Sequence, residues 1–189
     1  MRLLTKIVVI IIVILTIMHY RKYKAYAPDY EIQQQELDYI DGSNLYNQLN
    51  PLIITFIEDK SLLENVNTYK LYSPLSVSIK SPIYNTNNDY LSHSGEILFI
   101  RVKADITLEL INPKYTPKYK KIKSKDKLFS HYSLPISQNS NVKAIDIILH
   151  EYNIIFIPRH WLFKFADPNI SVELYSSHNI YTYLFNILH

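Results

Sequence analysis

The chain has almost no glycine: it contains two among 189 residues, where ordinary usage of about 7% would give roughly 13. Gly42 and Gly95 alone cannot build a G-x-G-x-x-G or Walker-type loop, so Gly-rich nucleotide-binding folds are excluded. Cysteine is absent, which excludes disulfides, thiolate zinc sites and a cysteine nucleophile. The net charge of +3 is mild and gives no reason to expect nucleic acid as a partner.

Signals of catalysis are also scarce. The histidines show neither H-x-x-x-H nor H-E-x-x-H spacing, and no Gly-x-Ser-x-Gly elbow for a serine nucleophile is present. The sequence therefore predicts no catalytic residue, no metal site and no cofactor, and His93 is the one residual candidate ligand. The seven histidines are His19, His93, His131, His150, His160, His178 and His189.

What the chain does have is an uncharged apolar run near its N-terminus, residues 7–18 (IVVIIIVILTIM). With its flanks the run covers residues 3–20, the lower end of the roughly 17–25 residues that span a bilayer. We therefore predict a single transmembrane anchor, with the lipid bilayer as its partner. Cations flank it as expected for snorkelling side chains: Lys6 on one side, and Arg21, Lys22 and Lys24 on the other.

Two questions about this segment stay open. A cleaved signal peptide is the rival interpretation, but the one cleavage candidate, Ala25-Tyr26-Ala27, is followed by an unfavourable Pro28. Orientation is nearly balanced, with 2 flanking cationic side chains against 3. We favour a cytosolic C-terminal domain, whereas the sequon that begins at Asn169 favours the other side.

The rest of the chain is typical of a stalk followed by one β-rich domain. Residues 21–49 are predicted to form a juxtamembrane stalk ending in a short helix at 44–49, and a capping box at 61–64 predicts a second short helix. Alternation of Ile106, Leu108 and Leu110 with polar residues indicates a half-buried strand. A turn is expected at 150–153, with Asn153 left-handed. The predicted strands are 52–57, 75–80, 97–103, 105–111, 144–149, 154–157, 171–175 and 180–185, a pattern that favours a sandwich or barrel.

Three segments resemble cupin-like domains related to JmjC proteins. They are residues 50–54 (NPLII), 97–113 (ILFIRVKADITLELINP) and 144–165 (AIDIILHEYNIIFIPRHWLFKF), and the last contains the family motif Ile157-Pro158-x-x-Trp161. The resemblance covers residues 50–189 and implies a mainly β, double-stranded β-helix (jelly-roll barrel) with short helices, in which Trp161 is a core or barrel-mouth residue. Membrane-anchored versions of such domains resemble proteins of large DNA viruses.

The same resemblance implies an Fe(II) site made by a His-x-Asp/Glu pair and a later histidine. In this chain Gly95 stands where the carboxylate is expected after His93, and Glu96 is one residue off. No histidine follows Trp161 at residues 162–164, and His160 is expected to point to the other face of a strand. We therefore expect a metal-free, catalytically inactive domain that acts as a structural or interaction module. The alternative is an active iron and 2-oxoglutarate oxygenase of hydroxylase or demethylase type.

A basic run at residues 114–127 offers a further alternative. We interpret the run either as a solvated loop between strands or as a surface that binds anionic lipid or another polyanion. No spaced aromatic platform accompanies the run, so we do not expect nucleic acid to bind there. A protein is the partner we expect for the domain as an interaction module. Its cations are Lys114, Lys118, Lys120, Lys121, Lys123, Lys125 and Lys127.

Overall fold

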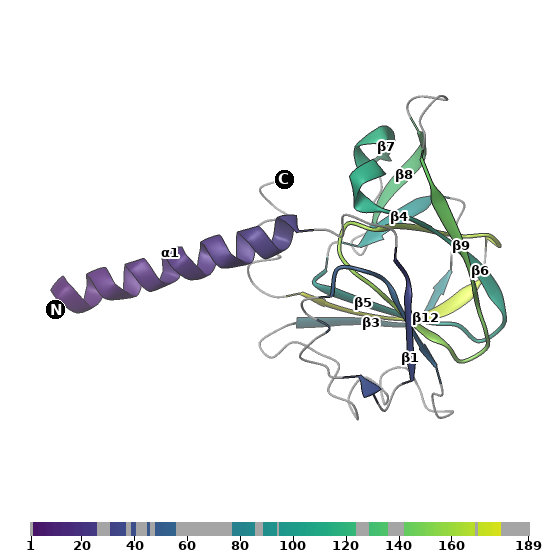
Figure 1. Ribbon diagram of the computed structural model, residues 1–189, viewed down its shortest axis with the longest axis horizontal. Helices are drawn as coiled ribbons and strands as arrows, with labels where there is room; N and C mark the ends of the chain where they lie inside the picture. Colours follow the sequence, from purple (N-terminus) through teal and green to yellow (C-terminus); the bar gives the residue numbers. More distant parts are fainter. Residues whose placement is uncertain are drawn as a thin grey trace.

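In the computed structural model, one long helix projects from a body made of two β-sheets (Figure 1). The structure describes residues 2–25, 31–36, 39–40, 45, 48–55, 77–85, 89–93, 95–123, 129–135, 142–168 and 170–178, with the backbone alone at 77–85. The predicted helix at 61–64, the predicted strand 180–185 and Asn169 lie outside these residues.

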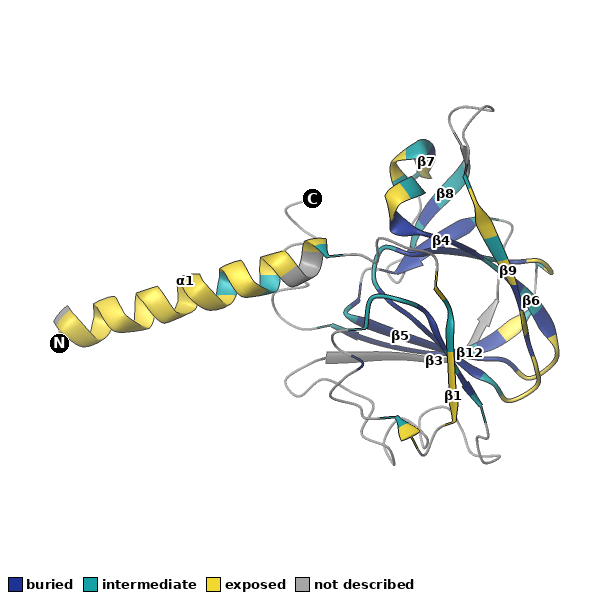
Figure 2. Ribbon diagram, viewed as in Figure 1, coloured by how far each residue is buried: buried dark blue, intermediate teal, exposed yellow. Residues whose placement is uncertain are grey.

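The helix α1 spans Arg2–Lys24. Its segment Leu3–Arg21 has a mean hydropathy of 2.4, and the apolar side chains from Leu3 to Met18 are all exposed (Figure 2). A helix that is apolar on every side and whose apolar side chains are exposed in the described part of the chain suits a lipid environment. By length and composition it fits an anchor or a signal sequence equally.

Each sheet has six strands. The first sheet has the order β1-β2-β10-β5-β12-β3 and the second has the order β7-β8-β4-β11-β6-β9. The strands are β1 (Gln33–Glu36), β2 (Leu52–Thr55), β3 (Val77–Asn85), β4 (Tyr90–His93), β5 (Ile97–Arg101), β6 (Ile106–Ile111), β7 (Tyr119–Ile122), β8 (Phe129–Pro135), β9 (Ala144–Leu149), β10 (Ile154–Ile157), β11 (Leu162–Phe165) and β12 (Ser171–His178).

The prediction of a mainly β protein with an N-terminal apolar helix is confirmed. Strand β9 has the predicted bounds, and β6 shows the predicted alternation, with Ile106, Leu108 and Leu110 buried while Thr107 and Glu109 are half-buried. The two strands pair antiparallel in a continuous register. Strands β5 and β10 are instead buried along their whole length, because apolar clusters cover both faces of the first sheet.

The space between the sheets is filled by apolar side chains. Strands of both sheets contribute to this cluster, and the aromatic rings of Phe163 and Phe165 meet edge to face at a centroid distance of 6.0 Å. Such close packing is typical of a protein interior. The fully buried members of this inter-sheet core include Leu98, Ile100, Leu108, Leu110, Leu149, Ile155, Ile157, Trp161 and Phe163.

Two local predictions were wrong. Residues 33–36, expected in an irregular stalk, form β1, which pairs parallel with β2; Gln33 N–H also donates to the Pro51 carbonyl at 3.0 Å. A polar, exposed strand is tolerated there because it lies at a sheet edge. In the predicted turn at 150–153 the left-handed residue is Tyr152 (φ 68°), not Asn153. The Arg101 guanidinium stacks on the Tyr152 ring at 5.1 Å from its centroid, which helps to hold that conformation.

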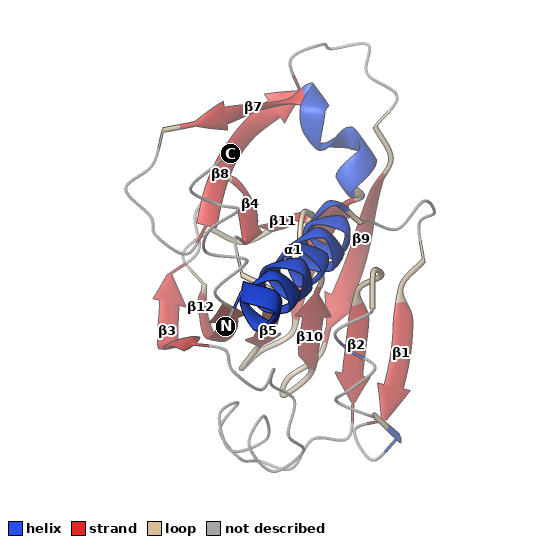
Figure 3. Cartoon of the chain, turned by 90° about the vertical axis from the view of Figure 1, so that its left-hand side faces the viewer, coloured by secondary structure: helices blue, strands red, loops and turns tan. Residues whose placement is uncertain are grey.

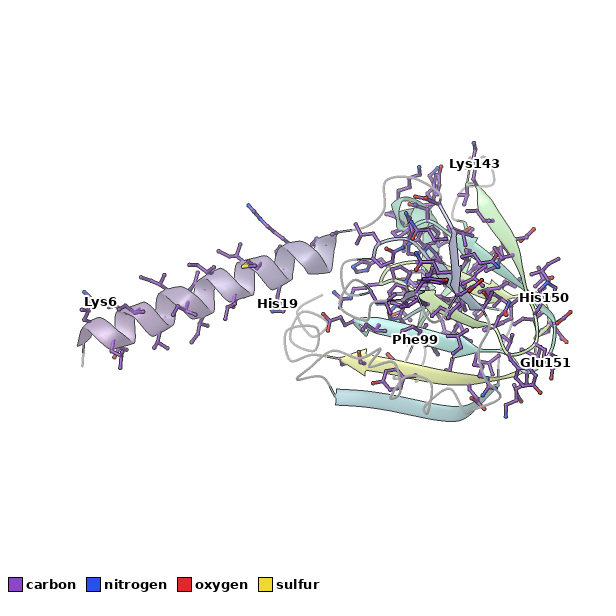
Figure 4. The ribbon with its side chains drawn as sticks, turned by 60° about the horizontal axis from the view of Figure 1, so that its bottom comes forward. Lys6, His19, Phe99, Lys143, His150 and Glu151 are labelled. Atoms are coloured by element: carbon purple, nitrogen blue, oxygen red, sulfur yellow. The ribbon has the colours of Figure 1, made fainter. Side chains whose placement is uncertain are left out.

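The two ends of the body differ. At the end away from α1, Asp105 accepts hydrogen bonds from the backbone N–H of Glu151 (2.9 Å) and pairs with His150 (3.2 Å). These contacts brace the β5–β6 and β9–β10 connections against each other, and His150 and Glu151 lie at this outer tip (Figure 4). Viewed from the side on which α1 projects, the helix stands in front of the strands (Figure 3).

Candidate functional site

The buried imidazole of His93 is the most unusual side chain at the end of the sandwich nearer α1. His93 ends β4 and its side chain is 3% exposed. Neither ring nitrogen has a hydrogen-bond partner of good geometry in the described part of the chain. Burial lowers the pKa of His93 to about 3, and the Arg159 guanidinium contributes to the same shift. At neutral pH the side chain is therefore an uncharged imidazole.

Further polar residues from two other segments surround His93. His178 ends β12 next to Ser176, whose hydroxyl oxygen lies 3.4 Å from its Nε2. Burial lowers the pKa of His178, the Arg159 charge adds to this shift, and Glu96 opposes it. Arg159 comes from the β10–β11 connection and its charge acts on both imidazoles, while His160 of the same connection acts on His93. Spacing in the sequence gives no sign of this cluster, because its members come from three separate segments.

Gly95 is held at a point where no side chain fits. A Cβ built on its backbone would lie 2.4 Å from Ser176 Oγ and 2.8 Å from the Ser177 carbonyl oxygen, closer than real Cβ contacts. The second contact is with backbone, which cannot rotate away. The cupin-like resemblance implies a carboxylate ligand at this position. The backbone around Gly95 leaves no room for such a side chain.

The region of the implied later histidine is also filled. Phe163 lies fully buried in β11 and packs edge to face on Phe129 at a centroid distance of 5.6 Å. His160, expected on a strand, instead lies in a left-handed turn (φ 71°) outside any strand. That expectation was wrong because β11 begins only at Leu162, after the Trp161 motif. Within the described ranges no three His, Asp or Glu side chains converge as metal ligands.

The motif Ile157-Pro158-x-x-Trp161 ends β10 and forms a loop that is hydrogen-bonded to two other segments. Ile157 and Trp161 are fully buried, and Pro158 is buried beside them. Trp161 Nε1 donates to the Leu49 carbonyl at 2.9 Å, while Arg159 Nε donates to the Gly95 carbonyl at 3.0 Å. The loop thus ties the segment just before β2 to the β4–β5 connection.

The basic run is not a loop over its described part, which corrects the prediction. Residues 113–118 form the 3₁₀ helix η2 (Pro113–Lys118), because the Asn112 side chain caps it and Pro113 sets its first turn; residues 119–122 form β7. Lys114 and Lys118 lie 5.3 and 5.0 Å from the Tyr115 ring centroid. Lys120, Lys121 and Lys123 are exposed, and Lys125 and Lys127 lie outside the described residues.

The cations predicted to flank a membrane occupy the two ends of α1. Lys6 lies in the exposed first part, and Arg21 is exposed near the other end. Lys24 Nζ lies 5.9 Å from the Tyr20 ring centroid, and the side chain of Lys22 is outside the described part. The arrangement is compatible with either kind of apolar segment.

Comparisons with known proteins leave the family open. No protein-family model and no curated protein matches the chain. The functional argument therefore rests on the fold and on the residues around His93.

Proposed function

We propose that α1 stays in the bilayer and holds a metal-free, cupin-like domain at the membrane of a virion or an infected cell, as a structural or interaction module. The close contact at Gly95 supports the proposal that the domain holds no metal, because a side chain there would overlap the Ser177 carbonyl. An iron and 2-oxoglutarate oxygenase would need a carboxylate ligand that this backbone cannot accommodate beside His93.

The strand order supports a double-stranded β-helix. Strands β3, β12, β5 and β10 are neighbours in the first sheet, and β4, β11, β6 and β9 are neighbours in the second. A jelly roll also consists of eight strands in two facing sheets, so this order supports the proposed fold. The described part of the space between the sheets is packed with apolar side chains, as we expect of a retained scaffold.

An interaction role is supported by the outer tip. The connections around Asp105 and Glu151 are braced by hydrogen bonds and lie at the end away from α1 (Figure 4). A rigid, exposed loop pair binds a protein partner with little loss of conformational entropy.

A second candidate function is the binding of anionic lipid or another polyanion. It is favoured because the basic run forms the regular elements η2 and β7. Lys114 and Lys118 each lie over the Tyr115 ring, so less side-chain entropy is lost when they meet an anionic surface.

Membrane retention tests the anchored part of the proposal. We expect the full chain, expressed with a C-terminal tag, to stay in the alkaline-extracted membrane pellet with an intact mass that includes α1. A matched variant, Ile11→Arg/Ile14→Arg, should lose this retention because two charges at the centre of the span are costly. A soluble wild-type chain whose mass starts after Ala27 would show a cleaved signal peptide instead.

A further inference from the structure

A small pocket lies where α1 meets the domain. Its walls are Ala25, Leu45, Gln48 and Leu49 on the stalk side and Glu96, Pro158 and Arg159 on the domain side. The space in it that can hold the centres of water-sized groups is about 30 Å³, within a hollow of about 370 Å³ that includes space open to solvent. That space holds roughly two water-sized groups, which is the scale of part of a headgroup and not of an acyl chain.

The position of Ala25 places this pocket at the membrane surface of an anchored chain. Ala25 directly follows α1, which ends at Lys24. Because the apolar segment ends at Arg21, Ala25 lies about one helical turn beyond it, at the depth of the lipid headgroups.

The pocket presents one charge of each sign on an apolar background. Among its lining residues, Arg159 is the one cation and Glu96 the one anion, and both are half-buried. Leu45 (4% exposed) and Pro158 supply buried apolar wall. The Gly95 carbonyl accepts from Arg159 Nε, which holds the guanidinium in place.

The histidines behind Arg159 do not change this balance. Burial and the Arg159 charge lower the pKa values of both His93 and His178, so neither adds positive charge at neutral pH. His160, the other titratable neighbour, lies in the same turn as Arg159. Among the lining residues of the pocket, a headgroup therefore meets one carboxylate and one guanidinium.

We propose that this pocket binds the headgroup of a zwitterionic phospholipid, with the phosphate on Arg159 and the amine on Glu96. A planar guanidinium suits phosphate oxygens, and a carboxylate suits an ammonium group. The inference rests on the proposed function, because it requires α1 to remain in the bilayer.

The test is lipid retention by the full chain. The protein is reconstituted in nanodiscs with equal amounts of phosphatidylethanolamine, phosphatidylcholine and phosphatidylglycerol, released into mild detergent, and examined by native mass spectrometry. We expect the wild-type chain to keep a zwitterionic lipid. Arg159→Gln should lower this retention at least about tenfold, the scale of one lost charge-assisted hydrogen bond. Glu96→Gln should instead raise retention of phosphatidylglycerol.

Two further variants keep the test decisive. Ala25→Trp fills the pocket without touching either charge and should also abolish retention, even if Arg159→Gln disturbs the Gly95 loop. Lys103→Gln, at an exposed cation in the β5–β6 connection, is the matched control and should behave as the wild type. Excess soluble phosphoethanolamine should compete weakly, since it lacks the glycerol and acyl chains held by the bilayer.

The outcomes separate this proposal from the previous one. Retention that is equal for the three lipids, or unchanged by Arg159→Gln and Ala25→Trp, would overturn the headgroup site while leaving the anchored domain intact. Recovery of a chain without α1 would overturn both proposals.

Discussion

At the scale of single residues, the burial of the His93 side chain lowers the stability of the folded chain. A fully buried imidazole with no hydrogen-bond partner of good geometry among the described residues destabilises the fold, and it destabilises it more when protonated. Its pKa of about 3 in the folded chain is below the ordinary 6.5 that applies on unfolding. The contribution of neutral His93 to the free energy of unfolding is therefore fully present above about pH 6.5 and is lost as the pH falls towards 3.

This predicts a pH-dependent difference between the wild-type chain and His93→Leu. Between pH 6 and 4 the free energy of unfolding should fall more steeply in the wild type, by up to about 1.4 kcal/mol per pH unit. Urea unfolding of the full chain in detergent measures it, with the fluorescence of buried Trp161 as the signal. Parallel wild-type and His93→Leu curves would contradict the assignment.

Gly95 makes the second residue-scale prediction. Gly95→Ala should lower the free energy of unfolding by about 1–3 kcal/mol, because the added Cβ overlaps Ser176 Oγ and the Ser177 carbonyl. Thermal unfolding followed by circular dichroism measures the change. Adding Ser176→Gly should recover only part of the loss, since the backbone contact remains. Full stability of the single variant would show that the position tolerates a side chain.

The sequence indicated Gly95 and Trp161 as important positions but could not indicate their surroundings. Gly95 stood out because a carboxylate was expected there, and Trp161 because of its motif. Ser176, His178 and Arg159 carry no local pattern, since their meeting depends on which strands become neighbours. Contacts between segments that are distant in the chain are set by the tertiary fold and not by the period of one strand.

At the scale of elements, the strands that the sequence predicts well are those with one exposed and one buried face. Strand β6 is an example, because alternation is a local signal. Strands β1, β4, β7, β8 and β11 were not predicted. In β1 and β7 exposed polar or basic side chains at sheet edges hide the pattern, and pairing with a neighbour makes the strand.

The basic surface of η2 and β7 provides the prediction at this scale. Lys120→Gln/Lys121→Gln should weaken binding to vesicles of phosphatidylserine and phosphatidylcholine about thirtyfold, since each lysine near such a surface contributes roughly 1 kcal/mol. Co-sedimentation of a chain lacking α1, after its Trp161 emission is shown to be that of the folded protein, measures this binding.

The control for that experiment changes the same number of charges elsewhere. Lys103→Gln/Lys143→Gln should retain most of the binding, and wild-type binding should fall steeply with salt. Equal losses in both double variants would mean that net charge, and not the η2–β7 surface, governs binding.

At the scale of the whole molecule, two ends with different chemistry are separated by an apolar core. The end near α1 holds His93, His178, Arg159 and the pocket beside Ala25. The outer end holds the braced turn at Tyr152. The sequence predicted the apolar helix and the mainly β body, because both depend on local hydrophobicity. It could not predict that the polar cluster lies beside the point where the helix leaves the body.

The most direct test of the central claim, a cupin-like domain without its metal, is the metal content and turnover of the full chain. The chain is purified in detergent, incubated anaerobically with Fe(II) and 2-oxoglutarate, desalted, and assayed for bound iron and for oxygen-dependent succinate formation. We predict iron far below one per chain and no succinate above the level of Gly95→Ala. One iron per chain together with oxygen-dependent turnover of 2-oxoglutarate would contradict the account.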